Sequence, residues 1–566
     1  MNDVLISYLD RSVLQADRIS TELTADTWQV IPYEAGDVKG NLLLSGEMSA
    51  SPEVTLHLGL SGWYKIFVAT VNFRSHNYFT LRLKSDAGFT GMCSPSHGST
   101  HHWSKVECFQ EFFWKAARLD GEDLILRKPN TSFSNAAALA WIRCVPMTEE
   151  EISAEGAKGC MRIHTHIDEE PNFEDDVDCD EGLLTRVYPI TKGDVTDCSL
   201  EISFDYDVPE YESALRAKSS ELGREKKDEA FYKVRERAYR VRIDELHSKG
   251  IKAYATNRMS VAAFTLPYGN SRWTRRTFVE EHPELYCKTR DGRTLPVCSY
   301  AYKQTREFVL DTLTSYMKYG FDGVSLIFHR GLHIHFEEPV ISRFSELYPS
   351  VDARRVPASD PRLHGVWCDM MTEFMVELRK RLGNLTINVI TEYSPKTAKH
   401  FGIDVEGWAK AGLIDGVYQG IMETVERLDG CMAEDGLIDL SLYESKLKKE
   451  PILSRYHKTD IEKTLDGARE YLDVLKGTDV TFAATLPWPH SHSPEGCIEW
   501  KERIAALGIR DLLCWNTNHL MYDLPELYSV IYSADALTEE KYTQKSYRTL
   551  SLAGSDISTF DTNWRG

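Results

Sequence analysis

Two glutamates stand where the chain could carry out acid–base chemistry. Glu392 directly follows the apolar run LTINVIT, and Glu423 follows the short segment YQGIM. Hydrolysis of a glycosidic bond needs two carboxyl groups, one protonated to assist the leaving oxygen and one ionised as nucleophile or base. If the two runs form neighbouring strands about 4.8 Å apart, the carboxylates approach the separation that this reaction needs. We therefore predict Glu392 and Glu423 as a catalytic pair, with the assignment of the two roles left open.

Other polar and aromatic residues follow apolar runs and could hold a sugar. An Arg fork suits the carboxylate of a uronic acid, and an indole ring can stack on the C–H face of a sugar ring. Asp205 and Asp207 end the run SLEISFDYD, where they alternate with apolar residues. The predicted substrate-binding residues are Asp205, Asp207, Asn257, His329, Arg330, His333, His335, Glu337, Tyr393, Trp488, His490, Trp515, Asn516 and Asn518.

The histidines offer a second kind of site. His164 and His166 alternate on one apolar run, so both imidazoles would lie on the same side of a strand, as two ligands of a zinc ion must. A zinc-dependent amidohydrolase of this kind also takes an Asp from the last strand of its barrel, and the segment CWNTN supplies none. We therefore favour hydrogen-bonding histidines in a polar cleft and predict neither a metal nor another cofactor.

The elements that must position these residues follow a repeated order of helix, Gly, apolar strand and polar tip. ELHSKGIKAYATNR and the stretch up to GFDGVSLIFHR both have it. This order is typical of a (β/α)₈ barrel, which keeps its chemistry at the C-terminal ends of the strands. The predicted barrel strands are 160–167, 199–207, 251–257, 324–330, 385–393, 415–423, 479–488 and 509–518.

The first part of the chain has a different pattern. Short strand-like pieces recur there between Gly, Asn, Asp and Ser, as in an antiparallel β-sandwich. We predict a multidomain α/β protein with a β-sandwich over 1–147, a catalytic (β/α)₈ barrel over 148–540 and a tail over 541–566 that packs on the surface. The piece GLSGWYKIFVAT resembles a strand of carbohydrate-binding sandwiches. The sandwich is therefore interpreted as either a sugar-binding or a structural domain.

Composition limits the partners. The net charge of −20 makes nucleic acid and anionic membrane surfaces poor partners, because both require a basic face. No run of 18 apolar residues predicts a membrane-spanning helix. The twelve cysteines form no CxxC pair and the first residues do not resemble a signal peptide, so we expect a cytoplasmic protein. A secreted protein whose signal peptide had been removed would look the same.

Longer segments of the barrel resemble the glycosyl-hydrolase-like family 10 group, which is found in polysaccharide-degrading bacteria. The resemblance rests on ELHSKGIKAYA, HPELYCKTRDG, GFDGVSLIFHRG and GIDVEGWAKAGLIDGV, and it covers roughly 230–420. It implies a glycoside hydrolase that acts on an oligosaccharide or polysaccharide fragment. Acidic multidomain glycosidases are often dimers, so a homodimer is one of the oligomeric states that the sequence leaves open. The group often carries Asp where this chain has Ile327, and Trp-Asp where it reads Trp515-Asn516. Because both departures remove a carboxylate, a non-catalytic glycan-binding barrel is the remaining alternative.

Overall fold

The structure of the protein is a computed structural model. It describes residues 2–22, 24–46, 49–71, 78–93, 108–129, 136–155, 161–167, 179–185, 187–192, 194–203, 225–262, 277–329, 333–357, 359–420, 461–486, 494–515, 517 and 545–552.

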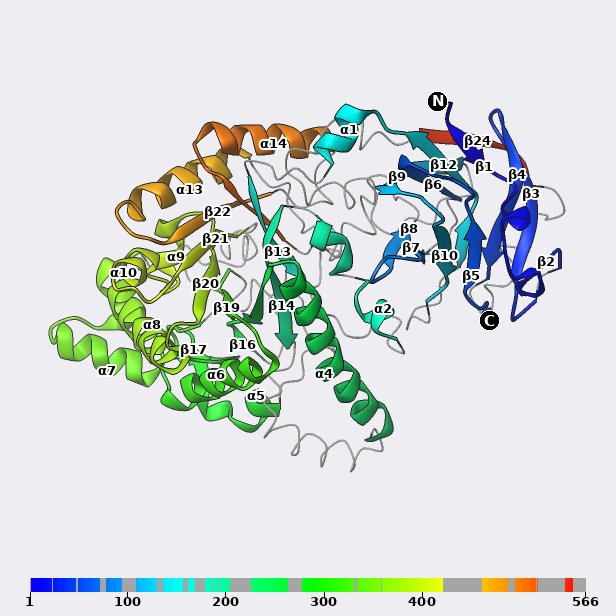
Figure 1. Ribbon diagram of the computed structural model, residues 1–566. Coiled ribbons are helices and arrows are strands. Elements are labelled where there is room, and N and C mark those ends of the chain that lie inside the picture. Colours follow the sequence, from blue (N-terminus) through cyan, green and yellow to red (C-terminus); the bar gives the residue numbers. More distant parts are fainter. Residues whose placement is uncertain are drawn as a thin grey trace.

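The larger unit is a closed barrel of eight parallel strands, which confirms the predicted fold class. Figure 1 shows the barrel with its surrounding helices on one side and the N-terminal sheets on the other. Its strands, in the order in which they pair, are β13 (Arg162–Ile167), β14 (Val195–Ser203), β15 (Lys252–Arg258), β19 (Gly323–Ile327), β20 (Thr386–Thr391), β21 (Gly416–Gln419), β22 (Thr481–Thr485) and β23 (Asp511–Cys514). Each of the eight predicted segments supplies one of these strands.

Two predicted strands are displaced. The second was expected at 199–207, but β14 begins at Val195, where it pairs with Ile163 of β13. Its first residues, VTD, look like a loop in the sequence because Asp197 faces the inside of the barrel rather than the apolar outer layer. The fourth was expected at 324–330, but β19 ends at Ile327, so that His329 follows the strand.

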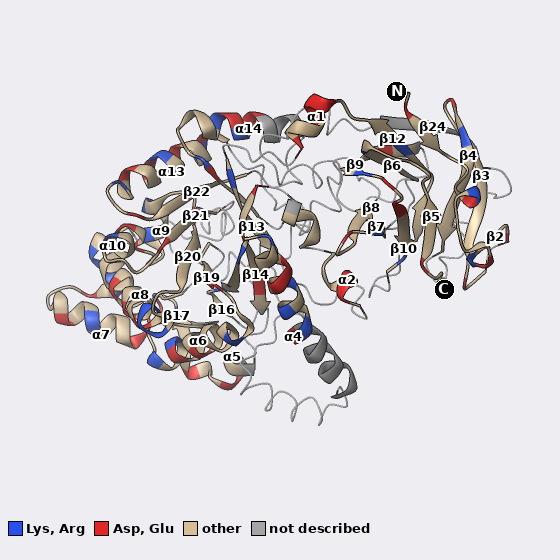
Figure 2. Ribbon diagram, in the orientation of Figure 1, with Lys and Arg blue, Asp and Glu red and all other residues tan. Residues whose placement is uncertain are grey.

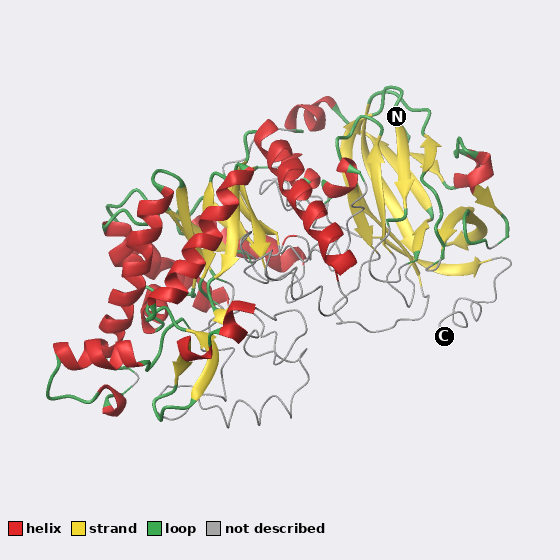
Figure 3. Ribbon diagram, turned by 90° about the horizontal axis from the view of Figure 1, so that it is seen from below, coloured by secondary structure: helices red, strands yellow, loops and turns green. Residues whose placement is uncertain are grey.

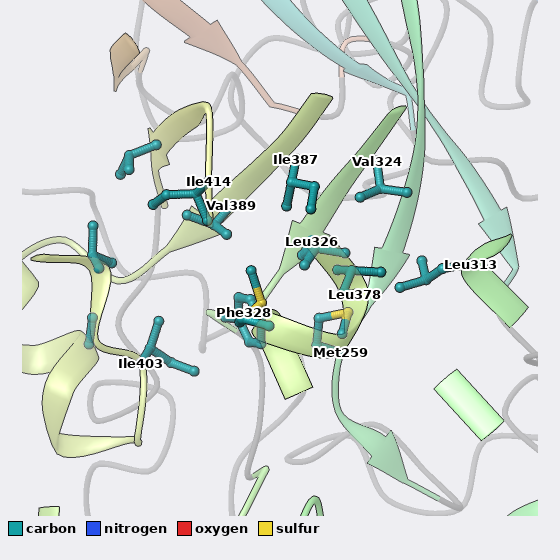
Figure 4. Packing of buried hydrophobic residues seen from close by; sticks show 14 of the residues in the cluster. Met259, Leu313, Val324, Leu326, Phe328, Leu378, Ile387, Val389, Ile403 and Ile414 are labelled. Atoms are coloured by element: carbon teal, nitrogen blue, oxygen red, sulfur yellow. The ribbon is translucent and has the colours of Figure 1, made fainter. Parts of the chain in front are cut away.

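Strand residues alternate between an apolar outer layer and a more polar lumen. Cys198, Leu200 and Ile202 of β14 join the main hydrophobic core, whereas Asp197, Ser199 and Glu201 have the opposite parity. Figure 4 shows the outer layer at β19 and β20, where Val324, Leu326, Ile387 and Val389 lie among residues such as Leu313 and Leu378 of the surrounding helices. A small apolar cluster also lies in the lumen and consists of Ile327, Ile390, Tyr418, Ala483, Leu513 and Trp515.

Helices cover the outside of the barrel, as Figure 3 shows. The long helix between β19 and β20 buries ten side chains, because its apolar residues recur every three or four positions. Figure 2 shows that both signs of charge are spread over the outer surfaces of the helices. No described helix is both long enough and apolar enough to cross a membrane. From the second barrel strand onward the described α-helices are α4 (Glu225–Ser248), α5 (Thr277–Glu281), α6 (Lys303–Tyr316), α7 (Glu338–Leu347), α8 (Pro361–Leu382), α9 (Pro395–His400), α10 (Val405–Lys410), α13 (Ile461–Val474) and α14 (Pro494–Ala506).

The N-terminal part consists of two mainly antiparallel sheets, in which β2 alone among the described strands pairs in parallel. Two short helices follow it, α1 (Glu149–Ala154) and α2 (Asp180–Leu183). A shared core that includes Trp28, Ile66 and Leu124 joins the sheets. The smaller sheet has the order β5 (Val54–His57), β10 (Asp123–Arg127), β7 (Tyr78–Leu83) and β8 (Thr90–Cys93). The larger has the order β1 (Val4–Ile6), β12 (Trp141–Pro146), β6 (Trp63–Val71), β9 (Cys108–Arg118), β24 (Lys545–Leu552), β3 (Trp28–Ala35), β4 (Val38–Ser45) and β11 (Ala137–Leu139), with β2 (Ile19–Ser20) beside β3.

Strand β24 departs from the predicted surface tail over 541–566, of which the structure describes residues 545–552. It lies inside the larger sheet, antiparallel to β9 on one side and to β3 on the other. Figure 1 shows this red strand among the blue strands of the N-terminal part. Its neighbours Tyr33 and Phe109 have ring centroids 4.8 Å apart and belong to one buried cluster. The barrel is therefore inserted between two segments of one sheet.

Candidate active site

A layer of polar and aromatic side chains lies at the C-terminal end of the barrel lumen. His166 of β13 stacks on Trp515, which follows β23, with ring centroids 3.9 Å apart and an interplanar angle of 3°. Its Nε2 atom is 3.9 Å from Oε2 of Glu201. Arg258 donates from Nε and Nη2 to the two carboxylate oxygens of Glu201, at 2.8 and 3.4 Å. Barrel enzymes keep their active sites at this end, so this layer is the candidate active site.

His329 belongs to the same layer. Its ring lies 4.8 Å from that of Trp515, at 73°. On its other side it approaches Gly420, where an added Cβ would lie 2.1 Å from the carbonyl oxygen of Thr391 and 3.0 Å from the His329 ring. The space that the His329 ring occupies is therefore available only because residue 420, directly after β21, has no side chain.

Glu392 lies where the sequence predicted, directly after β20. Ile390 belongs to the lumen cluster, so Glu392, two residues further on, has the parity that faces the lumen. Its backbone carbonyl accepts a hydrogen bond of 2.9 Å from the hydroxyl of Tyr471, and the residue is 1% exposed. This bond to α13 fixes the backbone from which the carboxylate projects.

A second group of charges lies deeper, toward the N-terminal ends of the strands. His164 is hydrogen-bonded through Nδ1 to Asp197 at 2.6 Å and through Nε2 to Asp511 at 2.9 Å. Arg162 also donates to both oxygens of Asp511. Burial alone would lower the pKa of His164, but the two carboxylates outweigh burial and raise it to about 9. Each ring nitrogen thus faces a carboxylate, an arrangement that favours a protonated imidazole over a zinc ligand.

We expect this arrangement to make stability depend on pH. Because the pKa of His164 is higher in the folded protein than in the unfolded chain, its protonation stabilises the fold. This contribution is fully present below the unfolded pKa of about 6.5 and is lost as the pH rises through about 9. The loss between pH 6.5 and 9.5 is on the order of 3 kcal/mol. Urea unfolding of the wild type and of His164→Gln at both pH values measures it. An equal fall in the free energy of unfolding of both proteins would contradict the assignment.

Three predicted sugar-binding residues instead hold the loop between β19 and α7. His333 Nε2 contacts the carbonyl oxygen of Phe328 at 3.0 Å, and burial lowers the pKa of His333 to about 4. His335 Nδ1 contacts the carbonyl oxygen of Lys288 at 2.9 Å. Glu337 accepts backbone N–H bonds from Lys288 and His335 at 3.1 and 2.9 Å, and burial raises its pKa. The loop is thereby joined to a small antiparallel sheet of β16 (Val261–Ala262), β17 (Tyr286–Lys288) and β18 (Thr294–Cys298).

Replacing Glu337 by Ala is expected to destabilise the protein by roughly 2–4 kcal/mol, because two buried backbone N–H groups lose their acceptor. The neighbouring Glu338, whose side chain is 76% exposed, supplies the control, and Glu338→Ala should change stability by less than about 0.5 kcal/mol. Chemical denaturation measures both. Equal effects of the two substitutions would show that the carboxylate of Glu337 does not brace the loop.

Two other predicted residues face away from the lumen. Asn257 has the parity of Ala253 and Ala255 in the outer core, and its amide nitrogen lies 3.9 Å from the sulfur of Met259. The ring of Tyr393 lies 5.5 Å from Nζ of Lys463 on α13. The structure therefore does not bring these two residues to the layer at the mouth.

The remaining predicted site residues lie outside the described residues. These are Glu423, Asp205, Asp207, Arg330, Trp488, His490, Asn516 and Asn518. Their assignment stays a prediction. Within the described ranges, no three His, Cys, Asp or Glu side chains gather closely enough to hold a metal ion.

Sequence reasoning missed Glu201 and Arg258, which form the buried ion pair of the layer. Both lie within strands rather than after them. The polar residues expected at the ends of the second and third strands were instead Asp205, Asp207 and Asn257. Strict alternation was the signal that could have found them. Counted from the outward-facing Leu200 and Ala255, Glu201 and Arg258 both fall on the inner face.

A cavity of about 140 Å³ lies on the N-terminal sheets, beside α1. Phe67 and Phe113 line it with ring centroids 5.6 Å apart, and Lys65 pairs with Glu151 at 2.8 Å. Ligand pockets usually measure about 300–1,000 Å³. This cavity is therefore smaller than a usual ligand pocket, and the role of the sandwich stays a prediction.

No family model matches the chain, and no curated protein matches it. Solved structures, in contrast, do match the chain. An α-galactosidase from Thermus thermophilus, in complex with p-nitrophenyl α-D-galactopyranoside, is 12% identical, with 90% of this chain and 95% of that chain covered and a TM-score of 0.33. A GH26-CBM35 β-(1,4)-mannanase from Podospora anserina is 9% identical, with 96% of each chain covered and a TM-score of 0.27. At these identities and TM-scores the matches do not indicate an activity.

Proposed function

We propose that this protein is a glycoside hydrolase that cleaves an O-glycosyl bond in an oligosaccharide or polysaccharide fragment, with Glu392 as a catalytic carboxylate. The observation that carries the proposal is the position of Glu392, which follows β20 on the lumen-facing side at the C-terminal end of the barrel. Acid–base chemistry at this end of a barrel needs a carboxyl group held on a fixed backbone, and the Tyr471 bond provides one.

The surrounding layer suits a sugar ring. Arg258, His329 and His166 are polar groups at the same end of the lumen, and Trp515 supplies an aromatic ring among them. One face of that indole is already covered by His166. We therefore expect Trp515 to shape the base of the sugar site, together with the imidazole stacked on it.

The resemblance to the glycosyl-hydrolase-like family 10 group supports the same class of reaction and remains part of the proposal. The zinc-hydrolase alternative loses support because carboxylates already bind both nitrogens of His164. The glycan-binding alternative is distinguished by experiment.

The test is sugar release from a broad panel of oligosaccharides, including uronic acid-containing ones, before and after treatment with a chelator. Release that survives chelation supports the two-carboxylate hydrolase and identifies the substrate. Release that vanishes and returns with zinc would assign the chemistry to a metal. Binding of glycans without release of reducing ends would make the barrel a binding module.

A further inference from the structure

Glu201 is a buried carboxylate that the sequence analysis did not select. It is 0% exposed and lies in β14 with the parity that faces the lumen. Arg258 on the neighbouring strand holds both of its oxygens, and His166 on the other neighbouring strand lies 3.9 Å away. A charged pair at this depth is costly unless its geometry is good, so its place at the functional end of the barrel calls for an explanation.

The strand register gives the height of Glu201 in the barrel. Ser199 pairs with Tyr254, and Tyr254 pairs with Gly323. Yet the hydroxyl of Ser199 contacts that of Ser325, two residues beyond Gly323, at 2.9 Å. Positions of equal height therefore climb by about one residue per strand from β14 toward β20, as the tilt of an eight-stranded barrel requires.

The same rule connects Glu201 with Glu392. Glu201 pairs with Thr256, Thr256 with Ser325, and Ser325 with Asn388. Across three strands the position at the height of Glu201 moves about three residues beyond Asn388, to Thr391 on β20. The lumen-facing residues there are Ile390 and Glu392, and Ile390 belongs to the apolar cluster. By this register the two glutamates lie within about one residue of the same height and project from strands three positions apart.

We propose that Glu201 is the second catalytic carboxylate and acts with Glu392 across the lumen. This inference rests on the proposed function. Arg258 pairs with Glu201 as an anion, so Glu201 takes the role of base and Glu392 that of acid. Glu392 gives its proton to the glycosidic oxygen as the bond from that oxygen to C1 breaks. A water oxygen forms the new bond to C1 and passes its proton to Glu201. The products are the free sugar and the alcohol of the leaving group.

The test uses the purified full chain and the p-nitrophenyl glycoside that the wild type hydrolyses fastest. We expect Glu201→Ala to lose about 10²- to 10⁴-fold in kcat. Added azide should restore p-nitrophenol release and yield a glycosyl azide, because azide attacks C1 without giving up a proton. Glu201→Gln, which keeps an acceptor for Arg258, should lose a similar factor while its thermal midpoint stays closer to that of the wild type.

Glu111 supplies the matched control, because it is also a buried glutamate and accepts from Arg143 at 3.0 Å, but in the N-terminal sheets. Glu111→Ala should lower stability while kcat stays unchanged and azide has no effect. A Glu201→Gln protein that keeps full kcat, or a folded Glu201→Ala protein that azide does not rescue, overturns the inference while the proposed function stands. If Glu423→Gln abolishes activity while the Glu201 variants keep it, the inference is likewise overturned and the proposed function stands. A wild type that hydrolyses no glycoside would overturn the proposed function, and with it this inference.

Discussion

Replacing Glu392 by Gln should reduce sugar release by about 10²- to 10⁴-fold while the protein remains folded. Gln keeps the size of the side chain and removes its titratable proton. The backbone bond from Tyr471 to the carbonyl of Glu392 does not involve the side chain, so the end of β20 should keep its position. Initial rates on the best substrate of the panel, together with circular dichroism, measure the two effects.

The control for this substitution is Glu373→Gln on α8. Glu373 is 43% exposed on its side chain and pairs with Arg343 at the surface. The Glu373→Gln protein should therefore release sugar at the wild-type rate. Full activity of Glu392→Gln would remove Glu392 from the mechanism and leave the proposal without its main support.

Deleting residues 541–566 should unfold the N-terminal sheets. The deletion removes β24 and leaves β3 and β9 without their shared neighbour. Each lost backbone hydrogen bond costs about 1 kcal/mol, and the net stability of a domain is only about 5–15 kcal/mol. Limited proteolysis followed by mass spectrometry would detect cleavage between β3 and β12.

A chain that ends at Leu552 retains β24 and should resist the protease like the full chain. A synthetic peptide of residues 541–566 should protect the shortened protein when added to it, as strand addition to an open sheet predicts. Equal resistance of the two shortened proteins would show that the sheet does not depend on β24.

The architecture of the barrel could be predicted because its signal is local. Apolar strand residues alternate with polar ones, and a Gly ends the helix before most strands. Each strand could therefore be predicted from its own residues. Strand β24 could not be found in this way, because its place between β9 and β3 depends on pairing partners more than 400 residues away. Nothing in its own residues distinguishes an internal strand from a surface tail.

The candidate site was predictable only in part, for a geometric reason. Glu392, His329 and Trp515 were found because each follows an apolar run with lumen-facing parity. Asn257 and Tyr393 also follow or end such runs, but a shift of one residue turns a side chain to the opposite face. The strand ends therefore indicate the end of the barrel at which the candidate site lies, whereas the face that each side chain occupies depends on the strand register.

The insertion of the barrel into the N-terminal sheet has a consequence for synthesis on the ribosome. Strands β3 and β9 are made early, and β24 follows more than 400 residues later. At 5–20 residues per second, this interval lasts roughly 20 to 90 seconds. During that time two open strand edges are exposed to other chains, which is the condition under which sheets aggregate. The nascent chain should therefore be a client of chaperones that shield strand edges until β24 emerges and closes the sheet.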